Sequence, residues 1–299
     1  MSPMPFTQPS AGPSRQPAAF RDIAVIANDL PCDSAALATA AALARHHGAE
    51  LDVVQVLAMP LSAVDAWSLV PDPACVERYA QIREAAAKRA LAFQRGLPPL
   101  GVEGRVLTFE AYGESPAGIA ATAARRADLS VIARPDGPPS DASRVHDVFA
   151  ALLLESGRPV LLVPAGHASP SLPPRHAVIA WSDTREAARA VHDALPLLAS
   201  AETVDILMVD PVASFLEDTA SFGSVLAAHL ERHGVTARIV TETSRGRLVA
   251  GVILDRASRA KAQLIVAGGY GHSRLREWVI GGTTRNLFFD TPVPILFSH

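Results

Sequence analysis

The chain has 299 residues, of which 49% are hydrophobic and 5% aromatic, and its formal net charge is −3. This length suits one large domain or two domains of ordinary size. So small a net charge gives no bulk electrostatic attraction to nucleic acid or to an anionic membrane surface. The two cysteines, Cys32 and Cys75, form no CxxC motif, which disfavours a disulfide framework or a thiolate zinc site.

Residues 1–20 are rich in proline and serine and lack the apolar core of a secretory signal. We expect this segment to be a disordered lead-in. No apolar run elsewhere in the sequence is long enough to span a bilayer. These features predict a cytoplasmic protein with neither a nucleic-acid nor a membrane partner.

In the first half, short apolar runs alternate with helix-like segments. Asp33-Ser34 is predicted to cap the first helix, which ends near Gly48, and Ser115 to cap a later helix with Pro116 at its first position. Strands are expected at 23–27, 51–57, 102–108, 129–133 and 159–163. After the first helix, further helices are expected at 75–95, 115–126 and 145–155.

The pattern restarts after a segment rich in proline and serine at 165–174, which we interpret as a linker. Asp183, with Glu186 three residues later, is predicted to cap the next helix as a capping box. Strands are expected at 177–181, 204–209, 235–240, 264–267 and 294–297, with helices at 185–198, 216–233 and 248–259. Such alternation is typical of βαβ units in a parallel sheet.

The two halves are an internal duplication. Ala127-Asp128-Leu129 corresponds to Ala262-Gln263-Leu264, and Pro159-Val160-Leu161 to Pro294-Ile295-Leu296, at the same interval along the chain. A repeat of this length predicts tandem domains rather than a solenoid. The expected domains are residues 21–164 and residues 175–299.

A glycine-rich segment follows the strand at 264–267. Two residues separate Gly268 from Gly271, and nine separate Gly271 from Gly281, which Gly282 follows. Glycine has no Cβ, so backbone N–H groups in such a loop can closely approach an anion. The second half therefore predicts a phosphate-binding loop.

This spacing resembles the universal stress protein family, whose nucleotide-binding members carry the same glycines followed by serine or threonine. Here Gly282 takes the hydroxyl position and Thr283 comes one place later. The resemblance covers nearly all of the chain after Phe20. It implies an α/β fold of two tandem flavodoxin- or Rossmann-like domains of the nucleotide α-hydrolase-like type. Each would be a five-stranded parallel sheet with helices on both faces.

The resemblance implies a stress-response sensor or binding module that binds ATP, ADP or AMP, with or without Mg²⁺, in its second half. No catalytic or metal-ligating residue is assigned. The nucleotide-binding residues that it implies are Ala180, Trp181, Ser182, Val209, Gly268, Gly271, His272, Ser273, Gly281, Gly282, Thr283 and Thr284.

The corresponding loop of the first half is unsuited to phosphate. Gly137 lies among prolines, which offer no N–H group. We expect residues 21–164 to be a degenerate universal stress domain without a nucleotide. In the family two such domains pair through their last strands, which here implies an intrachain pseudo-dimer through 158–164 and 293–298. A homodimer of chains is left open.

Two other functions remain open. The chain could be an interaction protein that binds no nucleotide and whose sites are vestigial. It could instead be a weak nucleotide hydrolase, for which only His272 lies near enough in sequence to act on a phosphate. At most, slow ATP hydrolysis is expected.

Overall fold

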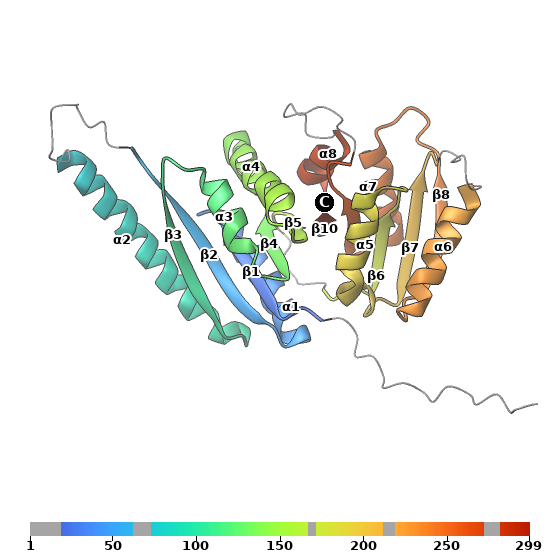
Figure 1. The fold of residues 1–299 in the computed structure, drawn as a ribbon, viewed down its shortest axis with the longest axis horizontal. Helices are drawn as coiled ribbons and strands as arrows, with labels where there is room; N and C mark the ends of the chain where they lie inside the picture. Colours follow the sequence, from blue (N-terminus) through green and yellow to red (C-terminus); the bar gives the residue numbers. More distant parts are fainter. Residues whose placement is uncertain (1–18, 62–72, 167–171, 212–218, 272–281) are drawn as a thin grey trace, which may run out of the picture.

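The computed structural model describes residues 19–61, 73–166, 172–211, 219–271 and 282–299 (Figure 1). Four predictions therefore lie wholly or partly outside the described residues: the disordered segment at 1–20, the linker at 165–174, the start of the helix at 216–233 and the loop at 272–281.

Each half contributes five strands. The first half contains β1 (Asp22–Ala27), α1 (Asp33–His47), β2 (Glu50–Met59), α2 (Pro73–Gly96), the short helix η1 (Pro98–Leu100), β3 (Gly104–Tyr112), α3 (Pro116–Ala124), β4 (Leu129–Ala133), α4 (Pro139–Glu155) and β5 (Val160–Val163). The second half contains β6 (His176–Ala180), α5 (Arg185–Leu198), β7 (Thr203–Val209), α6 (Thr219–Arg232), β8 (Ala237–Glu242), α7 (Val249–Ala260), β9 (Leu264–Gly268), α8 (Gly282–Asp290) and β10 (Ile295–Ser298).

All ten strands form one sheet in the order β3-β2-β1-β4-β5-β10-β9-β6-β7-β8, which crosses the whole molecule (Figure 1). Neighbouring strands are parallel except at the centre, where β5 and β10 pair antiparallel with Ile295 opposite Leu162. The predicted α/β class with a mostly parallel sheet is confirmed.

Helices cover both faces of the sheet, so the central strands are buried on both sides. Every residue of β4, β5 and β10 is buried, as expected of apolar strands in parallel sheets. The hydrophobic core on one face is formed with α1, α5 and α6, and the core on the other face with α3, α4, α7 and α8. No helix in the described part of the chain is long and apolar enough to cross a membrane.

The helix starts only partly follow the sequence signals. The Ser115 hydroxyl accepts a hydrogen bond from Gly118 N–H at 3.4 Å, so this predicted cap is confirmed. The prediction for Asp33-Ser34 was wrong: Cys32 is the N-cap, Asp33 is the first residue of α1, and its carboxylate accepts from Asn28 N–H and Leu30 N–H in the preceding loop. In addition, α4 begins at Pro139 rather than Val145.

The prediction for Asp183 was also wrong. Thr184 is the N-cap of α5, and its hydroxyl accepts from Ala187 N–H at 3.3 Å. The prediction placed the cap one residue too early, because Asp and Thr both favour this position and only the backbone geometry separates them.

The two halves share an aromatic junction between α4 and the end of the chain. The Phe149 ring lies 5.1 Å from the Phe288 ring and 5.2 Å from the Phe297 ring, between centroids. His146 stacks on Phe289 at 5.5 Å. Burial lowers the pKa of His146, so its ring is neutral and packs as an aromatic group. This junction ties α4 to the segment that follows the glycine-rich loop.

Candidate functional site

A cavity of about 370 Å³ lies beyond the carboxyl ends of β6, β7 and β9. Strand order reverses between β6 and β9, the position where open α/β sheets bind ligands. The structure brings together around this cavity nine of the residues predicted from sequence: Ala180, Trp181, Ser182, Val209, Gly268, Gly271, Gly282, Thr283 and Thr284. The other three, His272, Ser273 and Gly281, lie outside the described residues.

The glycines around the cavity have different roles. A Cβ on Gly268 would lie 2.6 Å from the backbone nitrogen of Ala187, so β9 can pack against α5 only with glycine there. Among the residues that the structure describes, a Cβ on Gly282 would meet nothing within 4 Å. Packing therefore explains Gly268, whereas the backbone at Gly282 is open to the approach of a ligand.

The first turn of α8 borders the cavity. Its first three residues are Gly282, Thr283 and Thr284, and it has no acidic residue in this turn. The N–H groups of a first helical turn have no partner within the helix, and the helix dipole adds partial positive charge there. This end of the cavity can accept an anion.

The hydroxyl of Thr284 is already engaged. It is buried and accepts a hydrogen bond from Tyr270 N–H at 3.2 Å, which joins the end of β9 to the start of α8. Tyr270 takes a positive φ of 60°, so the chain turns sharply here. Thr284 therefore positions the two sides of the loop, while Thr283 remains exposed at the cavity.

The opposite wall is mostly apolar. Ala180 and Val209 end neighbouring strands, and Ile253 of α7 packs beside them. The indole N–H of Trp181 is buried and has no hydrogen-bond partner in the part of the chain that the structure describes. The cavity thus combines an apolar wall with an anion-accepting helix end.

Sequence reasoning missed three polar residues of the cavity, Thr184, Glu186 and Tyr270. The sequence pattern assigned Glu186 to a capping box, so it was not predicted to line the cavity. No sequence motif marks Thr184 or Tyr270. Only 4% of Glu186 is exposed. Burial opposes its ionisation, but the hydrogen bond from Arg185 outweighs burial and lowers the pKa of the carboxyl, so Glu186 is charged near neutral pH.

This carboxylate lies beside the glycine-rich segment, since one of its oxygens would be 3.1 Å from a Cβ on Gly271. It suits a hydroxyl donor of a ligand and repels a phosphate. Across the described ranges, no three His, Cys, Asp or Glu side chains cluster as a metal site would require.

Comparison with solved structures identifies the fold. A universal stress protein from Archaeoglobus fulgidus DSM 4304 superposes with a TM-score of 0.72 at 14% identity, covering 93% of this chain and 95% of that one. A protein described as a universal stress protein from Pseudomonas aeruginosa UCBPP-PA14 gives 0.57 at 19% identity, covering 94% and 93%. A protein of unknown function from Pseudomonas aeruginosa PAO1 gives 0.55 at 18% identity, covering 94% and 92%.

The chain therefore has the fold of the universal stress proteins, over nearly its whole length and in the two-domain form. No protein-family model and no curated protein matches the sequence.

Proposed function

We propose that the chain is a tandem universal stress protein that binds ATP or another adenine nucleotide in its second half. One observation carries the proposal: nine residues chosen from the sequence as nucleotide ligands all border one cavity at the switch point of β6 and β9. Its volume of about 370 Å³ is within the range of small-molecule sites.

Each part of the cavity has a role in the proposed complex. The apolar wall at Ala180 and Val209 receives the adenine. The Glu186 carboxylate accepts a hydrogen bond from a ribose hydroxyl. The N–H groups of Gly282 and Thr283, in the first turn of α8, hold the phosphates, where the helix dipole favours negative charge. Mg²⁺ would accompany the phosphates of the nucleotide.

The protein acts as a binding module in the cytoplasm rather than as an enzyme. The antiparallel contact of β5 with β10 supports a pseudo-dimer of the two halves within one chain. Glu186 is the one carboxylate among the described residues that line the cavity, and we assign it to the ribose hydroxyl rather than to a water molecule, so hydrolysis is not the proposed role.

Calorimetric titration of nucleotide-stripped protein with ATP and Mg²⁺ tests the proposal. We expect one site per chain. Gly282→Val should weaken binding at least about tenfold, because the side chain would enter space that the phosphates need, and a Cβ there contacts none of the described residues. The double variant Gly271→Val/Gly281→Val should lose binding as well.

Gly137→Val is the matched control in the first half. Of the atoms that the structure describes, a Cβ there meets only a carboxylate oxygen of Asp141, at 3.8 Å, so the variant should fold and bind ATP as the parent does. No heat of binding in folded parent protein would refute the proposal. Two sites per chain would show that the first half also binds nucleotide.

A further inference from the structure

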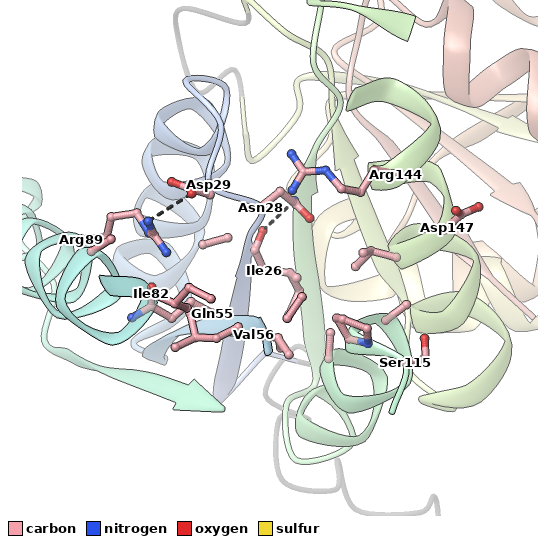
Figure 2. Close-up of a pocket in the computed structure, with 18 of the residues that line it drawn as sticks. Ile26, Asn28, Asp29, Gln55, Val56, Ile82, Arg89, Ser115, Arg144 and Asp147 are labelled. Atoms are coloured by element: carbon pink, nitrogen blue, oxygen red, sulfur yellow. Dashed lines mark hydrogen bonds and ion pairs between the residues drawn. The ribbon is translucent and has the colours of Figure 1, made fainter. Parts of the chain in front are cut away.

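A second and larger cavity, of about 600 Å³, lies in the first half (Figure 2). Strand β1 ends at Ala27, opposite Gln55, whereas β2 and β3 stay paired as far as Met59 and Tyr112. The space beyond the end of β1 is bounded by α2 on one side and by α3 and α4 on the other (Figure 2).

One face of α2 forms a wall of this cavity. The lining residues of this helix are Arg78, Gln81, Ile82, Ala85, Arg89 and Phe93, spaced as one helical face. The cavity of the second half has no lining residue from α6, the counterpart of α2, in the part of the chain that the structure describes. The helix α2 has 24 residues and α6 has 14. Because the longer helix α2 contributes a wall, the first cavity differs in its lining from the cavity of the second half.

Hydrogen bonds from one buried side chain hold the α2 wall in place against the neighbouring strands. The Gln55 side-chain amide donates to the Ala86 carbonyl of α2 at 3.2 Å and to the Thr108 hydroxyl of β3 at 2.8 Å. Gln55 is only 4% exposed. It therefore fixes α2 to the strand pair, and the cavity is preformed rather than a gap that collapses.

The floor of the cavity is apolar and its mouth is cationic. Ile26, Val56 and Ile82 lie along the floor (Figure 2). At the mouth the Arg144 guanidinium points from α4 towards Asn28 (Figure 2). Its ion pair with Asp141 is long, at 3.6 Å, and 55% of the Arg144 side chain is exposed. Arg144 is therefore available to an incoming anion.

The charged residues that line this cavity have a net positive charge. Three arginines and two carboxylates are among the residues that line the cavity. Asp29 is paired with Arg89 at 3.1 Å, and Asp147 lies on α4. Arg78 also lines the cavity and makes no ion pair with any residue that the structure describes. An apolar floor below two exposed arginines, Arg78 and the loosely paired Arg144, suits a ligand with an apolar body and one anionic head.

A nucleotide phosphate chain does not suit this site. The loop after β4 contains Pro135, Pro138 and Pro139, which have no N–H groups, and α4 begins inside this proline run. Asp136 and Asp141 add negative charge to the same segment. A phosphate chain would meet carboxylates where the second half offers free backbone donors.

We propose that the first half binds a small amphipathic organic acid. Its carboxylate lies at the mouth between Arg144 and Asn28, and its apolar body lies along Ile26, Val56 and Ile82. The site is independent of the nucleotide site in the second half.

Titration calorimetry with octanoate, octan-1-ol and octylammonium tests this proposal on the full chain. Octanoate should bind once per chain, octan-1-ol about tenfold more weakly, and octylammonium more weakly still, because only the carboxylate gains a charge-assisted hydrogen bond. Arg144→Gln should remove most of the preference for octanoate over octan-1-ol, because it weakens octanoate binding and leaves the affinity for octan-1-ol unchanged.

Ala85→Trp fills the cavity from an exposed position of α2 and should abolish octanoate binding. Ala87→Trp places the same side chain at an exposed position of α2 that does not line the cavity, and should bind octanoate normally. Both should unfold at the parental temperature, and both should bind ATP as the parent does.

Gly282→Val separates the two proposals, since it should keep octanoate binding whatever it does to ATP. The inference is overturned if the folded parent gives no saturable heat with octanoate. Octylammonium binding as tight as octanoate, or undiminished octanoate binding in Ala85→Trp, would overturn it equally.

Discussion

At the scale of single residues, burial decides what the ionisable groups do. His47, near the end of α1, packs edge-on against Phe20 at 5.1 Å between ring centroids. Burial, helped by the neighbouring His46, lowers the pKa of His47 to about 4. An imidazole in an unfolded chain titrates near pH 6.5. Between these values the unfolded chain binds a proton that the folded chain does not.

The free energy of unfolding should therefore fall as the pH drops from about 6.5 to about 4, and His47 should lower it no further below that. A half-buried ring is partly screened, so we expect a loss of about 1–2 kcal/mol. His47→Phe should remove this part of the loss. Urea unfolding at pH 7 and pH 4.5 measures it.

His192→Gln is the matched control, because 74% of the His192 side chain is exposed. It should show the pH dependence of the parent. A decline in His47→Phe as steep as that of the parent would contradict the assignment.

Asp205 shows the same principle for a carboxylate. Its side chain is fully buried in β7, and it is hydrogen-bonded by Arg238 of β8 and by Arg256 of α7, the latter at 2.6 Å. Burial raises the pKa of Asp205, but these hydrogen bonds outweigh burial and lower it below the usual value. A charge within the second half of the sheet is thus stabilised by partners far apart in sequence.

At the scale of the element, the start of α5 sets one wall of the nucleotide cavity. Thr184 accepts the hydrogen bond of Ala187 N–H, and Gly268 packs against the same turn. Thr184→Ala should lower the free energy of unfolding by about 1 kcal/mol, because the N–H loses its cap. Asp183→Ala should change it by less than about 0.5 kcal/mol, as is usual for a surface position.

Urea unfolding of the two variants at pH 7 makes the comparison. The substitutions are adjacent and equally conservative in size. A larger loss in Asp183→Ala than in Thr184→Ala would restore the capping box that the sequence predicted.

At the scale of the whole molecule, α4 joins the two halves. Phe149 is fully buried and its ring contacts Phe288 and Phe297, which belong to the other half. Phe149→Ala should lower the free energy of unfolding by about 3–5 kcal/mol, since it leaves a cavity in a core that both halves share. Urea unfolding followed by circular dichroism measures the loss.

Leu154→Ala removes a side chain of the same helix that is 49% exposed. It should cost less than about 1 kcal/mol, because little apolar surface is buried there. Similar losses in the two variants would mean that the junction contributes little to stability.

The sequence by itself determined the α/β class, the order of the strands along the chain and most of the helix positions. Each depends on local signals: apolar runs of strand length, helical periodicity, and capping residues such as Ser115, where a helix begins, and Gly48, where one ends. The spacing of the glycines after β9 carried the family resemblance, and nine of the twelve residues that the resemblance implied border one cavity.

The tertiary structure alone decided what depends on residues distant in the chain. Only packing shows that Gly268 is needed against α5, or that the buried Glu186 faces the second-half cavity. The cavity of the first half needs the end of β1, one face of α2 and the mouth residue Arg144 to meet, although they are separated along the chain. No local sequence pattern predicts that these elements lie side by side, because strands that are remote in sequence must first pair to form the sheet that positions them.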